Sequence, residues 1–255
     1  MKPLFVEQIG RGPDLTLLHG WGLNGAVWDG IRDELAQHFT LHLIDLPGHG
    51  YSQHVPIDSL AAAADAVATV MPPRGHLLGW SLGGQFALAL AHRAPEKINK
   101  LILVGTTPRF IATDNWPYGK KAVVLDQFAA NLTENYHATI RRFLALQMLN
   151  HADQRATITT LQAAVSARGA PNADHLANGL ALLRTNDFRD QLLNIQHRTL
   201  VIQGDRDALT SERAGHWLAT KIPASRYEKI AFATHAPFLS HRDIFMVRLI
   251  EFLHL

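Results

Sequence analysis

The sequence contains no cysteine, which excludes several kinds of structure and chemistry. Disulfides, zinc sites built on thiolates and a cysteine nucleophile are all ruled out. Long apolar runs are also missing, because no stretch reaches the roughly 18 apolar residues that suggest a transmembrane helix. Residues 1–8 include a glutamate and no long apolar core, so they do not resemble a signal peptide. We therefore expect a cytoplasmic protein that does not associate with a membrane.

Strong charge of either sign is missing too. The 255 residues carry a formal net charge of +2, and the basic residues are dispersed, with only short pairs at 120–121 and 141–142. A nucleic-acid partner calls for longer basic runs or patches, so none is expected. The 15 histidines lack the spacing of metal ligands, and no Gly-Lys-Ser/Thr follows the glycines at 79–84. The sequence thus predicts no metal site and no cofactor.

Short apolar runs recur along the chain, each ending in a glycine or a polar turn. They lie at residues 15–18, 41–44, 76–78, 101–104 and 200–202. Near-continuous apolar runs of this length are typical of strands in a parallel sheet that is covered on both faces. Segments with helical patterning, such as 28–38 and 82–92, lie between several of them. The alternation predicts an α/β fold with a central, mostly parallel sheet and helices on both faces.

The alternation stops after Thr107 and resumes at Leu200. Between them the apolar residues recur at helical spacing, at Phe128, Leu132, Ile140, Phe143, Leu144, Leu146 and Leu149, and no strand is evident. A single crossover between neighbouring strands does not need so many residues. We therefore predict a helical insertion at 108–192 between two parts of one α/β core, 1–107 and 193–255.

A serine stands at a sharp strand-to-helix corner in Gly79-Trp80-Ser81-Leu82-Gly83. A strand that turns directly into a helix strains the backbone of its corner residue, and small residues two before and two after relieve the resulting clash. The corner would expose the Ser81 hydroxyl at a helix N-terminus, where backbone N–H groups favour negative charge. The pattern predicts a nucleophile; the alternative is an ordinary serine N-cap.

A serine nucleophile needs a histidine base and an acid that orients it, and after such a corner they follow in the order serine, acid, histidine. The run at 200–204 is followed by Asp205 and Asp207. Asp207 lies farther along the loop and is the predicted acid, whereas Asp205 suits a turn. The predicted base is His235, which lies among small residues before Pro237.

Negative charge on a reacting carbonyl oxygen also needs an oxyanion hole of two N–H groups. One comes from the residue after the nucleophile, Leu82, and the other from a loop that follows an early strand. The stretch His19-Gly20-Trp21-Gly22 fits that loop, so Trp21 N–H is the predicted second donor and His19 is expected to brace the loop.

Together these residues resemble the α/β-hydrolase superfamily. The marks are His19-Gly20-Trp21-Gly22, residues 45–52 (DLPGHGYS), Gly79-Trp80-Ser81-Leu82-Gly83-Gly84, Gly204 with Asp207, and His235. The resemblance implies the α/β-hydrolase fold, with 108–192 as a helical cap over the active site.

A closer resemblance is carried by residues 18–24, 39–43, 142–147 and 235–238. These stretches are similar to the esterases that cleave the methyl ester of a pimeloyl chain held on acyl carrier protein in biotin synthesis. The resemblance implies a serine carboxylesterase that uses Ser81, His235 and Asp207, with acyl carrier protein as its partner. We also expect the protein to be a monomer.

Acyl carrier proteins are acidic, so a docking face should be basic. Residues 141–170 contain four arginines, Arg141, Arg142, Arg155 and Arg168, and a single acid. We expect Arg142 and Arg155 to contact the carrier, although solvated helix faces would look the same. Further positions that are basic in the family are not basic here, for example Ala138 and Thr159.

The acyl pocket should be apolar, and its candidate walls are Trp21, Trp80 and Phe143. For Trp80 and Phe143 ordinary core packing is the alternative. Three other functions stay open: a general carboxylesterase acting on small acyl esters, a hydrolase of carbon–carbon bonds, and a binding protein of this fold without turnover. The last usually lacks a member of the triad, and Ser81, Asp207 and His235 are all present.

Overall fold

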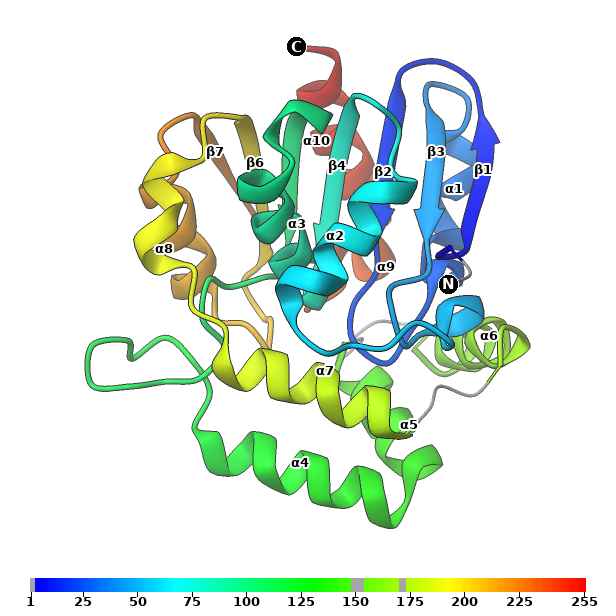
Figure 1. Cartoon of the computed structure of the whole chain (residues 1–255), viewed down its shortest axis with the longest axis vertical. Helices are drawn as coiled ribbons and strands as arrows, with labels where there is room; N and C mark the ends of the chain where they lie inside the picture. The colour runs from blue at the N-terminus through cyan, green and yellow to red at the C-terminus, as the bar shows by residue number, and fades with distance from the viewer. Residues whose placement is uncertain (1–2, 148–153, 170–172) are drawn as a thin grey trace.

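The computed structural model of the chain describes residues 3–147, 154–169 and 173–255. Within them, seven strands form one sheet in the order β1-β3-β2-β4-β5-β6-β7 (Figure 1). Strand β1 runs antiparallel to β3, and the other neighbours are parallel. The strands are β1 (Val6–Gly10), β2 (Asp14–Leu18), β3 (Thr40–Ile44), β4 (Gly75–Trp80), β5 (Ile98–Val104), β6 (Arg198–Gly204) and β7 (Ser225–Ile230).

Helices cover both faces of this sheet. In Figure 1, α2 (Leu60–Val70) and α3 (Leu82–Arg93) lie in front of it, while α1 (Asp29–Leu35) and α10 (Arg242–His254) lie behind. The other helices of the core are α8 (Glu212–Lys221), the short α9 (Pro237–Ser240) and the 3-10 turns η1 (Gly25–Trp28), η2 (Gly50–Ser52) and η3 (Pro95–Lys97). The predicted α/β fold with a mostly parallel sheet is confirmed.

The five predicted strands are present as β2 to β6, but two strands were not predicted. Strand β1 alternates half-buried and exposed residues, and β7 (SRYEKI) is largely polar. Both lie at an edge of the sheet, where one side of the strand has no partner and burial is incomplete. The apolar runs that mark the central strands are therefore absent from the two edges.

The helical insertion, residues 108–192, joins β5 to β6 and contains α4 (Ala122–Glu134), α5 (Tyr136–Gln147), α6 (Gln154–Ala167), α7 (Ala173–Thr185) and part of η4 (Arg189–Asn194). Three isolated β-bridges also lie in this segment, and the one between the residues farthest apart in the sequence pairs Arg109 with Asp187. Figure 1 shows α4, α5 and α7 below the end of the sheet at which the parallel strands finish. Among the described helices, none is long and apolar enough to cross a membrane.

Candidate active site

Ser81 occupies the strained corner that the sequence predicts, between β4 and α3. Its φ of 57° and ψ of −117° lie outside the regions that residues with a side chain prefer. The flanking glycines make the corner possible: a Cβ on Gly79 would lie 2.3 Å from Gly83 O, and one on Gly83 would lie 2.3 Å from Leu18 O. The hydroxyl of Thr106, in the loop after β5, donates to Ser81 O at 2.8 Å and fixes the corner.

The loops after β6 and β7 bring His235 and Asp207 together. His235 Nδ1 lies 2.8 Å from Asp207 Oδ2, and the two side chains are 1% and 0% exposed. Because the carboxylate only accepts, the proton of the neutral imidazole is on Nδ1 and Nε2 is left as a base. In the described part of the chain, His235 Nε2 is buried and has no hydrogen-bond partner. The pair therefore has a free basic nitrogen.

Asp207 is held by four donors besides the histidine. Its Oδ1 accepts from the backbone N–H groups of Leu209 at 2.7 Å and Thr210 at 2.8 Å. Its Oδ2 accepts from the Thr210 hydroxyl at 2.7 Å and from Gln203 Nε2 at 2.8 Å. Asp205, by contrast, is exposed and has no recorded contact with the histidine, and its N–H donates to Ile230 O. The geometry thus pairs His235 with Asp207.

Trp80 connects the histidine loop to the serine corner. Its indole N–H donates to His235 O at 2.9 Å, and its ring centroid lies 5.5 Å from that of His235. Since Trp80 directly precedes Ser81, this contact ties the loop of His235 to the residue next to the serine. The ring is fully buried against Trp28 and Phe238. Of the two interpretations considered above for Trp80, core packing is the one that these contacts match.

The two predicted oxyanion donors come from the start of α3 and from the loop after β2, a neighbour of β4 in the sheet. Leu82 is the first residue of α3, and Trp21 lies in the loop after β2. Within the described ranges, neither backbone N–H donates to a protein acceptor. For Leu82 this follows from its place in the first turn of a helix, where N–H groups have no partner in the helix.

Two buried histidines brace the Trp21 loop. His19 Nδ1 donates to Gly20 O at 2.8 Å while its Nε2 accepts from Leu46 N–H at 2.9 Å. His49 Nδ1 donates to Pro47 O, and its Nε2 accepts from Gly22 N–H at 3.1 Å. Each imidazole is thus used as one donor and one acceptor, which requires the neutral form.

Burial reinforces this neutrality. Desolvation lowers the pKa of His19 to about 4 and that of His49 to about 3, against an ordinary value near 6.5. Both histidines are therefore uncharged at neutral pH and hold the loop in place, as the sequence suggests for His19. The part played by His49 was not predicted, although its place in the DLPGHG stretch signals a tight turn.

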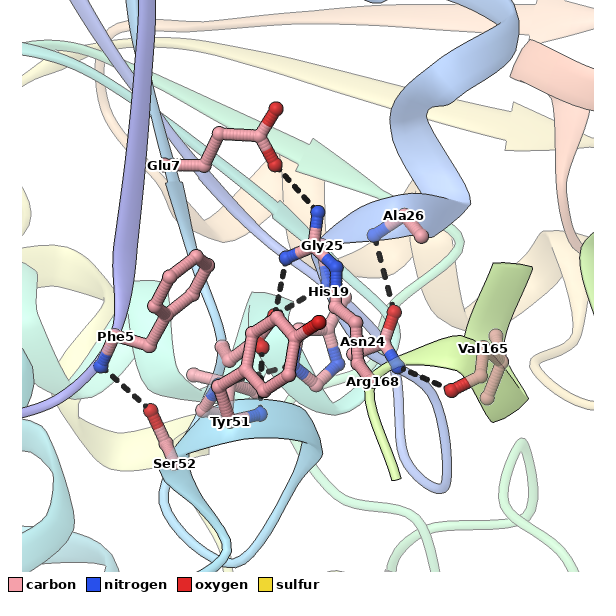
Figure 2. Close-up of polar contacts among 12 residues, drawn as sticks. Phe5, Glu7, His19, Asn24, Gly25, Ala26, Tyr51, Ser52, Val165 and Arg168 are labelled. Carbon is pink, nitrogen blue, oxygen red and sulfur yellow. Dashed lines mark hydrogen bonds and ion pairs between the residues drawn. The ribbon is translucent and has the colours of Figure 1, made fainter. Parts of the chain in front are cut away.

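Arg168 does not belong to the basic face that the sequence predicts. It follows α6 and points into the core, where Nη1 lies 3.1 Å from Asp45 Oδ1 and Nη2 lies 2.5 Å from Glu7 Oε2 (Figure 2). Its guanidinium stacks near the rings of Phe5 and Tyr51, at 5.4 and 5.8 Å from their centroids. Counting it as a surface charge was wrong, because its partners lie far away in the sequence.

The remaining predicted binding residues belong to the helical insertion. Phe143 of α5 is buried, and its ring lies 5.5 Å from that of Trp21. Arg142 and its neighbour Arg141 are exposed and form no ion pair with described residues. Arg155 belongs to α6, but its side chain lies outside the described residues. The structure therefore joins Phe143 to Trp21 and leaves Arg142 on the surface.

A family model described as the alpha/beta hydrolase fold matches residues 14–242. The chain belongs to the α/β-hydrolase family. Members of this family use a serine, an acid and a histidine on the corners and loops described above. Among the described residues, no group of three or more histidine, aspartate and glutamate side chains could hold a metal ion.

Individual α/β-hydrolases are similar over nearly the whole chain. A pimeloyl-[acyl-carrier protein] methyl ester esterase from Aeromonas salmonicida is 43% identical over 94% of this chain and 95% of its own. One from Nitrosomonas europaea is 38% identical over 96% and 98%. Among solved structures, a hydrolase from Pseudomonas aeruginosa is 28% identical with a TM-score of 0.86, covering 99% of this chain and 94% of that one.

Proposed function

We propose that the protein is a serine carboxylesterase that hydrolyses the methyl ester of a pimeloyl chain carried on acyl carrier protein. What supports the chemistry is the buried His235–Asp207 pair with its free Nε2, together with the strained corner of Ser81. The identity of the substrate is supported by the two relatives named above, which are esterases of that ester.

In the proposed reaction, Ser81 Oγ attacks the ester carbonyl while His235 Nε2 takes its proton. Asp207 keeps the proton on Nδ1 beforehand and supports the imidazolium that forms. The N–H groups of Trp21 and Leu82 bind the oxyanion, and each such donor typically contributes about 3–4 kcal/mol to the transition state. The imidazolium then protonates the departing methanol.

The acyl-enzyme is released by the same groups in reverse. His235 removes a proton from water, and the resulting nucleophile attacks the acyl carbonyl in the same oxyanion hole. Proton return to Ser81 restores the free enzyme and leaves a carboxylate at the end of the acyl chain. The cycle needs no cofactor.

Recognition of the carrier is proposed to use exposed arginines of the helical insertion. Arg141 and Arg142 of α5 are exposed and unpaired among described side chains, so they are available to an acidic partner. Arg155 is proposed to join them, as expected from the sequence. Such surface contacts speed association more than they tighten the complex, and they weaken as salt rises.

The test compares kcat/KM for pimeloyl methyl ester on acyl carrier protein and for a free short-chain methyl ester. We expect the carrier-bound ester to be preferred, and Ser81→Ala to be inactive on both. Arg142→Glu should reduce that preference at low salt. The matched control is Arg74→Glu, an exposed arginine just before β4, at the opposite end of that strand from the serine corner.

Two results would count against parts of the proposal. Equal activity on the free ester would indicate a general carboxylesterase and remove the role of the carrier. A loss of preference that Arg74→Glu reproduces would show a general effect of charge rather than a docking face.

A further inference from the structure

The side chain of Trp21 is held by the helical insertion rather than by the core loop that carries it. Its indole Nε1–H donates to Leu176 O of α7 at 2.9 Å. Its ring packs edge-on against Phe128 of α4 at 5.3 Å and Phe143 of α5 at 5.5 Å between centroids. Trp21 is 2% exposed. Three helices of the insertion therefore fix a residue whose backbone N–H is a proposed oxyanion donor.

Gly179 provides the space for this indole. A Cβ built on Gly179 would lie 2.9 Å from Trp21 Cδ1 and 3.0 Å from Nε1, which is too close for two carbons or for carbon and nitrogen. The glycine lies inside α7, where glycine is about 1 kcal/mol less favourable than alanine. Helix α7 thus has a glycine, which is unfavourable inside a helix, in the turn against which the Trp21 indole packs, close to the Leu176 carbonyl.

The Trp21 loop does not fix its own position. It is flanked by Gly20 and by Gly22, which has a φ of +74°. Contacts from other segments hold it instead: Gly22 N–H donates to His49, and at the far end Asn24 Nδ2 donates to Val165 O of α6 at 2.9 Å (Figure 2). Trp21 N–H, between these anchors, donates to no protein acceptor among the described residues, so a displaced indole would shift the Trp21 peptide with it.

We propose that Gly179 is a positioning residue for the oxyanion hole, because its bare Cα seats the Trp21 indole and so sets the place of Trp21 N–H. This inference rests on the proposed function. An oxyanion donor must lie about 2.7–3.1 Å from the developing charge, so a shift of several tenths of an ångström weakens it. A Cβ at 179 would also meet Leu82 Cδ2, but at 3.9 Å, which is an ordinary contact, and Gly179 itself takes no part in the chemistry.

The test is Gly179→Ala, assayed with p-nitrophenyl acetate so that carrier docking plays no part. We expect kcat to fall by at least about tenfold, a fraction of the 10²–10³ that loss of a whole donor costs, with KM changed by less than about threefold. The matched control is Gly30→Ala on α1, where a new Cβ would meet nothing within 4 Å. This control should keep the wild-type kcat.

A double variant separates positioning from general damage. Trp21→Ala keeps the backbone N–H of residue 21 and removes the indole, whose Cδ1 and Nε1 are the atoms that a Cβ at 179 would strike. The Gly179→Ala change should therefore lower kcat less in the Trp21→Ala background than in the wild type. Equal losses in both backgrounds would overturn the proposal, and so would a rise in KM with kcat unchanged.

Wild-type activity distinguishes the two levels of inference. If the wild type hydrolyses the ester and Gly179→Ala retains its kcat, the positioning role is wrong and the proposed function stands. If the wild type hydrolyses neither this ester nor the carrier-bound one, the proposed function fails and the positioning role falls with it.

Discussion

Replacing Asp207 with asparagine should place the wrong tautomer at His235. The side-chain oxygen of the asparagine would remain on the two backbone N–H groups of Leu209 and Thr210, which Asp207 Oδ1 occupies now. Its NH₂ group would then face His235 Nδ1, where Oδ2 accepts at 2.8 Å. The imidazole would have to accept at Nδ1 and carry its proton on Nε2, so it could not take the proton of Ser81.

The expected cost is large because the base is lost rather than weakened. In a serine–histidine–aspartate triad this change lowers kcat by about 10⁴. For Asp207→Asn we expect a fall of about 10³–10⁴ in kcat on a small ester at pH 7.5, with little change in KM. Asp205→Asn is the matched control and should stay within about threefold, because Asp205 is exposed and makes no recorded contact with His235.

The outcome that would refute this reasoning is an Asp207→Asn enzyme with a kcat within about tenfold of wild type. A larger loss in Asp205→Asn than in Asp207→Asn would refute it as well, and would assign the acid to the other aspartate. A melting temperature close to the wild-type value must accompany the result, so that lost activity is not lost folding.

Three further predictions concern stability. Arg168→Met should lower the free energy of unfolding by about 3–5 kcal/mol in urea titrations, because it leaves a buried carboxylate unpaired, whereas Arg141→Met should change it by less than about 1 kcal/mol; similar losses in both would contradict the buried pair. The pKa values of His19 and His49 are lowered in the folded protein, so below about pH 6.5 the unfolded chain binds more protons than the folded one. The free energy of unfolding should therefore fall as pH falls from 6.5 towards 4, by up to about 1.4 kcal/mol per pH unit for each histidine. Urea midpoints at pH 7.5 and 5 check this, and an unchanged midpoint would show that neither imidazole is held neutral. Gly83→Ala should cost at least about 2 kcal/mol in the same assay, since its Cβ would lie 2.3 Å from a backbone oxygen that cannot move aside; a neutral effect would show that the serine corner relaxes freely.

The serine corner and its partners could be predicted because their signals are local. Glycines at 79 and 83 reflect clashes within a few residues, and the run before Asp207 marks the strand from which its loop leaves. That Asp207 rather than Asp205 reaches His235 followed from its place farther along the loop. The two edge strands escaped prediction because half-exposed strands lack a continuous apolar run.

The contacts that Arg168 and Gly179 make with distant segments could not be predicted. Arg168 was interpreted from its neighbours in the sequence, whereas its ion-pair partners lie 123 and 161 residues earlier. The same limit applies to Gly179, a lone glycine in a helical pattern until the structure places the Trp21 ring against it. Whether a charged or small residue is buried, and which residues it contacts, depends on the assembled fold. The residues near it in the sequence do not give this information.

The Arg168 contacts also limit how the insertion could be exchanged among related enzymes. If a segment transplanted into this chain lacks an arginine at this place, the completely buried Asp45 keeps its two backbone N–H donors but loses its cationic partner. Arg168, which directly follows α6, thus attaches the end of that helix to Asp45 of the core and, through Glu7, to β1. Redesign of substrate preference in α4, α5 and α7 must keep the contacts that hold Trp21. A chimera that replaces the whole insertion must in addition either carry the arginine or neutralise Asp45 in the same step.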